Sequence, residues 1–138
     1  MSESKKQFLS TPTISRMEVV HDDERRTIRE VELEQFDGTM RRVTSIAIKA
    51  ATDGRPVILG NHYHDKTEDF VVISGKPKVV TAPESDPSDQ TQHEFPEGGF
   101  IGIKPGEAHT FIFTKPGELR STMSGTFEEG GMHPRKLV

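Results

Sequence analysis

The strongest constraint on the fold is a series of short segments rich in Val, Ile, Phe and Thr. They lie at residues 26–36, 41–50, 56–64, 68–74, 77–82, 100–104, 109–114 and 119–127. β-Branched and aromatic residues of this kind are typical of strands. Gly- and Pro-containing stretches at 36–39, 52–56, 74–77, 104–107 and 115–118 predict tight turns between them. No segment has a long helical period. The pattern therefore predicts an all-β fold with eight or more strands, as a barrel or a sandwich.

The length of 138 residues is that of one ordinary domain. Residues 1–14 are polar and predict a flexible N-terminal segment, followed by a single folded domain over 15–138. Residues 82–99 form the one long polar, proline-rich interruption. We expect a surface loop there, of a length that can also act as a lid.

Composition excludes several classes of function. The net charge is −4 and no basic stripe is present, so we expect no nucleic-acid partner. No apolar run approaches the roughly 18 residues of a membrane span, and the N-terminus lacks the apolar centre of a signal peptide. These features predict a cytoplasmic protein with no membrane partner. Cysteine is absent, so any metal must be bound through nitrogen and oxygen.

Two histidines and a glutamate lie close together in GNHYHDKTEDFVVISG, residues 60–75. Because side chains alternate along a strand, His62 and His64 share one face and Tyr63 takes the other. A turn at residues 65–67 would let Glu68, at the start of the next strand, join the histidine face. The sequence thus predicts that two imidazoles and one carboxylate converge. Borderline divalent metals accept ligands of these types.

A fourth candidate ligand, His109, follows a Pro-Gly turn and begins another strand. Four apolar residues share the strand phase of the candidate ligands, and we predict that they line a substrate pocket; they are Phe70, Val72, Phe111 and Phe113. By contrast, we expect Tyr63 to pack in the core or an interface. The remaining histidines, His21, His93 and His133, are expected at the surface or in loops.

The cluster resembles the first motif of the cupins, Gly-(five residues)-His-X-His-(three or four)-Glu-(six)-Gly. His62, His64, Glu68 and Gly75 match this motif, and Pro56 stands where the leading glycine is expected.

A second resemblance is to the other cupin motif, Gly-(five)-Pro-X-Gly-(two)-His-(three)-Asn. Gly98, Gly106 and His109 match, the proline is shifted by one position to Pro105, and Phe113 replaces the asparagine.

The resemblance implies a single-domain cupin β-barrel (double-stranded β-helix, or jelly roll). It also implies one divalent metal ion (Zn, Mn, Fe or Ni) on His62, His64, Glu68 and His109. A homodimer is expected, because cupin sheets often extend across a two-fold axis. Residues 60–75 look most like the cupin part of capsular-polysaccharide and keto-sugar isomerase enzymes. Residues 21–31 look like the first strand of deoxysugar epimerases, with Arg26 in place of a glycine.

These resemblances predict an enzyme that acts on a small carbonyl-bearing or sugar-like metabolite by isomerase- or epimerase-type proton transfer. A metal-dependent dioxygenase of a small organic substrate is an alternative, and a non-catalytic small-molecule-binding cupin is another. The cluster itself has three other interpretations, namely a polar edge strand, a metal-free acid–base pair and a structural metal site. The sequence identifies no general acid or base.

Overall fold

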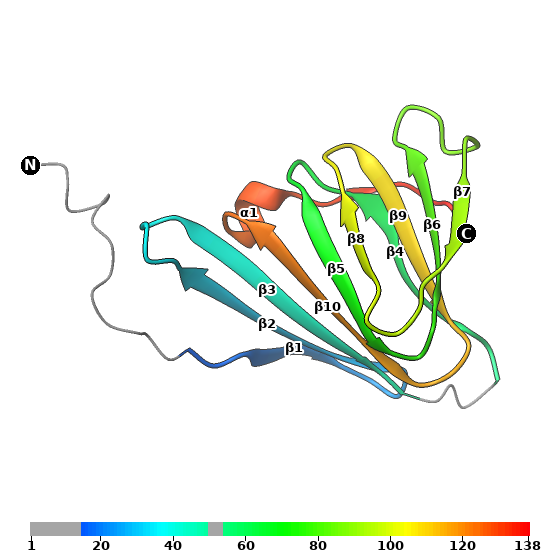
Figure 1. The fold of residues 1–138 in the computed structure, drawn as a ribbon, viewed down its shortest axis with the longest axis horizontal. Coiled ribbons are helices and arrows are strands. Elements are labelled where there is room, and N and C mark those ends of the chain that lie inside the picture. The colour runs from blue at the N-terminus through cyan, green and yellow to red at the C-terminus, as the bar shows by residue number, and fades with distance from the viewer. Residues whose placement is uncertain (1–14, 50–53) are drawn as a thin grey trace, which may run out of the picture.

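The computed structural model describes residues 15–49 and 54–138 (Figure 1). The segment 1–14 and part of the predicted turn at 52–56 lie outside these residues. The described part forms strands β1 (Glu18–Asp22), β2 (Arg26–Glu34), β3 (Met40–Ile48), β4 (Val57–Tyr63), β5 (Glu68–Ser74), β6 (Lys78–Pro83), β7 (Thr91–Glu94), β8 (Phe100–Ile103), β9 (Glu107–Phe113), β10 (Gly117–Ser124) and β11 (His133–Pro134), with one helical turn, α1 (Phe127–Gly130).

The strands form two antiparallel sheets (Figure 1). Sheet A has the order β1-β2-β3-β10-β5-β8 and sheet B the order β11-β4-β9-β6-β7. Each of the predicted apolar segments overlaps a strand, and the predicted turns at 36–39, 74–77, 104–107 and 115–118 lie where one strand ends and the next begins. The all-β prediction is therefore confirmed. Among the described residues, no helix is long and apolar enough to cross a membrane.

Four elements were not predicted, namely β1, β7, β11 and α1. The predicted loop at 82–99 contains β7, which pairs with β6 from Lys78 opposite Glu94 to Thr81 opposite Thr91. All residues of β7 are exposed, so this strand has no apolar alternation that could predict it. Helix α1 is one turn long and begins with a capping box formed by Thr126 and Glu129.

The two sheets pack face to face around the main apolar core. The side chains of this core alternate with outward-facing residues along the strands, as expected for a two-layer β fold. Its fully buried members include Val72, Phe111, Phe113 and Leu119. A smaller cluster covers the opposite face of sheet B, where Leu137 packs with Val80, Ala82 and Ala108.

Strand β4 changes its inward-facing phase at Gly60 and Asn61. Upstream of them Val57 and Leu59 are buried, whereas downstream His62 faces the same interior. The register between β4 and β9 skips Asn61, which marks a β-bulge. Asn61 has φ +57° and Gly60 has φ +106°. A Cβ atom at position 60 would collide with the backbone of β9, so only glycine fits there.

Candidate metal centre

Four potential ligands from three strands and one turn meet between the sheets. They are His62 on β4, His64 just after it, Glu68 at the start of β5, and His109 on β9, and their ligand atoms lie within 4.8 Å of one another. His64, Glu68 and His109 are buried, whereas His62 is half-buried. The bulge explains this geometry, because strict alternation from Leu59 would turn His62 outward.

Backbone carbonyls orient two of the imidazoles. Nδ1 of His64 is hydrogen-bonded to the carbonyl of Gly131. Nδ1 of His109 lies 3.4 Å from the carbonyl of Glu107. A carbonyl oxygen can only accept, so Nδ1 is the donor in each of these two contacts. Hydrogen bonds of this kind fix the ring orientation of histidines that bind metals.

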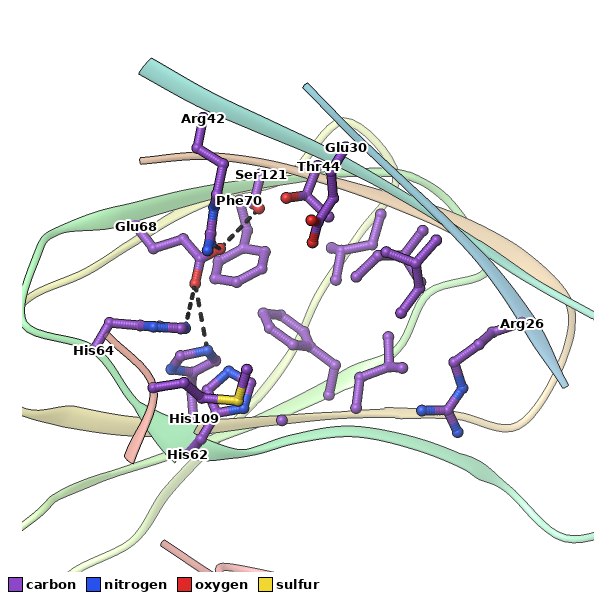
Figure 2. Close-up of a pocket in the computed structure, with 17 residues that line it drawn as sticks. Arg26, Glu30, Arg42, Thr44, His62, His64, Glu68, Phe70, His109 and Ser121 are labelled. Carbon is purple, nitrogen blue, oxygen red and sulfur yellow. Dashed lines mark hydrogen bonds and ion pairs between the residues drawn. The ribbon is translucent and has the colours of Figure 1, made fainter. Parts of the chain in front are cut away.

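The two oxygens of Glu68 have different surroundings (Figure 2). Oε2 accepts hydrogen bonds from Arg42 Nη2 and Ser121 Oγ, both at 2.8 Å. Oε1 faces Nε2 of His64 at 3.2 Å and Nε2 of His109 at 3.6 Å. Oε1 is buried and makes no hydrogen bond of regular geometry among the described residues. A buried oxygen of this kind requires a partner.

Electrostatics keep the ligands in the protonation states that metal binding needs. Burial lowers the pKa of His62 to about 3, and the neighbouring imidazoles of His109 and His64 add to this effect. Burial also lowers the pKa of His109 to about 4. Burial alone would raise the pKa of Glu68, but the facing imidazoles and the Arg42 guanidinium outweigh it and lower the pKa to about 2. At neutral pH, Glu68 is therefore ionised, and His62 and His109 are neutral.

The donor set fits a divalent cation. Three nitrogen donors and one carboxylate are ligands that zinc, manganese, iron and nickel accept. Bonds of about 2.0–2.2 Å place two ligand atoms at most about 4.3 Å apart, so small side-chain movements suffice to close the cluster. A cation at this position would also pair with Oε1 of Glu68, the one oxygen in the cluster that lacks a hydrogen bond.

The candidate ligands open onto a cavity of about 230 Å³. In Figure 2, the imidazoles and Glu68 lie at one end of it and Arg26 at the other. Of the residues predicted to line a pocket, Phe70 and Phe111 border this cavity. Val72 and Phe113 are instead buried in the core between the sheets and do not border it. The position where cupins carry an asparagine, Phe113, thus does not face this site.

Sequence reasoning missed Arg42, which supports Glu68 from β3. Its side chain is 9% exposed and forms an ion pair with Glu68. A signal was present, because Arg42 shares its strand phase with Thr44 and Ile48, and both of these are buried. An arginine on the inward phase of a strand requires an anionic partner. Ser121 carries no comparable signal, since serine is common on either face of a strand.

The other histidines lie outside the cluster. His21 is hydrogen-bonded to Asp23, and His93 is exposed on β7. His133 pairs with Asp65 at 3.0 Å and stacks on Tyr63 with ring centroids 4.8 Å apart. Tyr63 packs against the smaller apolar cluster on the opposite face of sheet B, as the alternation predicted.

Comparison with known proteins gives a likeness in structure alone. No protein-family model matches the sequence. No curated protein matches it either. Among solved structures, the capsular polysaccharide assembling protein CapF from Staphylococcus aureus is 18% identical with a TM-score of 0.66, over 93% of this chain and 34% of that protein.

Two further solved structures have other names. Vicilin from hazelnut, Corylus avellana, is 14% identical with a TM-score of 0.68, over 85% of this chain and 33% of the other. A variant of oxalate decarboxylase from Bacillus subtilis is 17% identical with a TM-score of 0.67, over 90% and 33%. The chain spans about a third of the length of each of these proteins.

All three proteins have the cupin fold, and the present chain has it too. In addition to this fold, the described residues bring together the four side chains that match the ligand positions of the two cupin motifs.

Proposed function

We propose that this chain is a metal-dependent cupin enzyme that catalyses proton transfer on a small carbonyl-bearing or sugar-like metabolite, as isomerases and epimerases do. The observation that supports it most is Glu68 Oε1, which is buried, ionised and directed at two imidazole nitrogens. His62, His64, Glu68 and His109 would hold the ion. When bound, a divalent metal can polarise a carbonyl oxygen and make the neighbouring C–H bond more acidic.

The cavity fits such a substrate in size. Its volume of about 230 Å³ is below the range of roughly 300–1,000 Å³ that is typical of pockets for drug-sized ligands. His62 is the ligand histidine with the most exposed side chain, so it borders the open side of the cluster. The fold likeness to CapF, named as a capsular polysaccharide assembling protein, supports a sugar-related substrate.

A metal-dependent dioxygenase is the second candidate, and the apolar part of the cavity favours it. The cavity wall contains six large apolar side chains, those of Ile28, Ile46, Leu59, Phe70, Phe111 and Leu119. An apolar organic substrate would be desolvated against this wall. Dioxygen consumption by the iron-loaded protein, measured with small organic substrates, separates this chemistry from proton transfer.

The first experiment is elemental analysis of protein purified without a metal-affinity column. We expect about one divalent ion per chain in the wild type and almost none in the double variant His62→Ala/His64→Ala. His93→Ala is the matched control, because His93 is exposed on β7 and far from the cluster in the sheet order. Metal-free wild type that stays empty after zinc, manganese, iron and nickel are offered would show that the four residues are not a ligand set.

A further inference from the structure

A second polar group of side chains lines the cavity on the wall formed by sheet A. Glu30 on β2 pairs with Thr44 on β3, and Thr44 pairs with Ser121 on β10. Directly paired residues on neighbouring strands point to the same face of a sheet, and all three border the cavity. In Figure 2, the oxygens of Glu30 and Thr44 point into the space that the imidazoles also border.

Ser121 has a partner in Glu68, but the other two residues of this row do not. Among the described residues, the Thr44 hydroxyl is buried and makes no hydrogen bond. The Glu30 carboxylate also accepts none within this part of the chain, since only burial and more distant charges act on it. Buried polar groups such as the Thr44 hydroxyl are generally satisfied, and a ligand in the cavity can reach both this hydroxyl and the half-buried Glu30 carboxylate.

The surroundings of Glu30 suit a hydrogen bond with a neutral group. Burial raises the pKa of Glu30, the Arg42 guanidinium opposes this, and the carboxylates of Glu32 and Glu68 reinforce it. A second carboxylate from a ligand would add to the negative charge of these neighbours. A hydroxyl adds no charge, and it can donate to the Glu30 carboxylate while it accepts from Thr44 Oγ1.

We propose that Glu30 and Thr44 form a hydroxyl-binding subsite, so that the ligand of the metal centre is a small hydroxylated carbonyl compound. This inference rests on the proposed function, since it places the carbonyl end of the ligand at the histidines. It names the feature that the substrate must carry, a neutral hydroxyl on the side away from the imidazoles. The subsite also acts against apolar substrates, because an alkyl group there would leave the buried Thr44 hydroxyl unpaired and cover the half-buried Glu30 carboxylate.

The test compares two ketones that differ only at this position. Dihydroxyacetone and 1-hydroxy-2-butanone share the same α-hydroxyketone end, but the first has a hydroxyl where the second has a methyl group. Each is titrated into the cobalt(II)-loaded protein, and binding is followed by the visible absorption of the cobalt ion. In the wild type, we expect dihydroxyacetone to bind about tenfold more tightly, equal to about 1.4 kcal/mol.

Two variants remove the subsite while leaving the ligand set in place. Thr44→Val keeps the side-chain shape without the hydroxyl, and Glu30→Met keeps a similar length without the carboxylate. We expect each to lower the preference for dihydroxyacetone to about threefold or less, with unchanged cobalt absorption in the absence of ketone. The matched controls, Thr122→Val on β10 and Glu34→Met on β2, alter residues that do not border the cavity and should keep the tenfold preference.

The outcomes separate the two proposals. If the wild type shows no cobalt absorption bands, the proposed metal centre is wrong, and the proposal of the subsite, which depends on it, is wrong too. If the bands are present but the wild type binds both ketones equally or not at all, the subsite alone is wrong. The subsite is also wrong if Thr44→Val and Glu30→Met both keep the full preference while they bind cobalt normally.

Discussion

Asn61 is the residue whose replacement tests most directly how the backbone builds the site. It occupies the bulge that directs His62 inward, with φ +57°. Its side-chain oxygen accepts hydrogen bonds from Thr110 Oγ1 at 2.8 Å, the Leu137 amide at 2.9 Å and the Val138 amide at 3.1 Å. Its side-chain amide donates to the Val138 carbonyl at 3.1 Å. Asn61 thus ties the bulge to β9 and to the last residues of the chain.

The cost of Asn61→Ala follows from these contacts. The bonds to Thr110 and Leu137 are partly buried, and each contributes about 1 kcal/mol. The two bonds to Val138 are exposed, so water replaces them at little cost. Alanine also tolerates the left-handed conformation less well than asparagine, by about 1 kcal/mol. We therefore expect the free energy of unfolding to fall by about 3 kcal/mol.

Asn61→Asp is the matched variant, because it keeps the accepting oxygen and replaces the exposed amide donor with a second carboxylate oxygen. We expect it to lower the free energy of unfolding by less than about 1 kcal/mol. Both variants are measured by urea unfolding of the metal-free protein, and an unchanged m-value confirms that the comparison is valid. Equal losses in the two variants, or a loss below about 1 kcal/mol in Asn61→Ala, would refute the assignment of the accepting oxygen as the anchor of the bulge.

Two further predictions concern the charges of the cluster. Arg42→Met leaves the buried Glu68 carboxylate without its cation, so the free energy of unfolding of the metal-free protein, measured in urea, should fall by about 3–5 kcal/mol. The double variant Arg42→Met/Glu68→Leu should recover most of this loss. If it does not, the ion pair is not the cause. The folded-state pKa of His109, about 4, lies below the unfolded value of roughly 6.5, so the unfolded chain binds more protons between these pH values. The free energy of unfolding of the metal-free protein should therefore fall by about 3 kcal/mol through this residue as the pH falls through that window. His109→Gln should reduce the dependence of the free energy of unfolding on pH, and an unchanged dependence would contradict the lowered pKa of His109.

Much of the fold follows from local patterns in the sequence. Segments such as 68–74 alternate and end at Gly-containing turns, and β5 occupies the predicted residues. Strand β7 escaped prediction because its exposed residues are held only by backbone bonds to β6. The order of strands in the sheets could not be predicted either, since β10 lies between β3 and β5 although it is far from both in sequence. Pairing of that kind depends on the whole topology and on no local pattern.

In the candidate site, too, some features follow from local sequence and others depend on strands that are distant in sequence. The ligands His62, His64 and Glu68 lie within seven residues of sequence, at the end of β4, in the turn after it and at the start of β5, so they are close together although these two strands belong to different sheets. Their supports come from strands that are neighbours only in the folded sheet, with Arg42 on β3 and Ser121 on β10. These supports decide the chemistry, because they hold one oxygen of Glu68 and leave the other directed at the imidazoles.

The bulge in β4 lets one strand contribute to both the apolar core and the polar cluster. Val57 and Leu59 need one strand phase to fill the core, whereas His62 needs the opposite phase to reach Glu68. A regular strand cannot satisfy both requirements, since a shift of one residue turns every later side chain to the other face. The Gly60–Asn61 pair resolves the conflict with two residues that accept positive φ. The same stretch of chain can therefore complete the apolar core and, within a few residues, place an imidazole in the polar cluster.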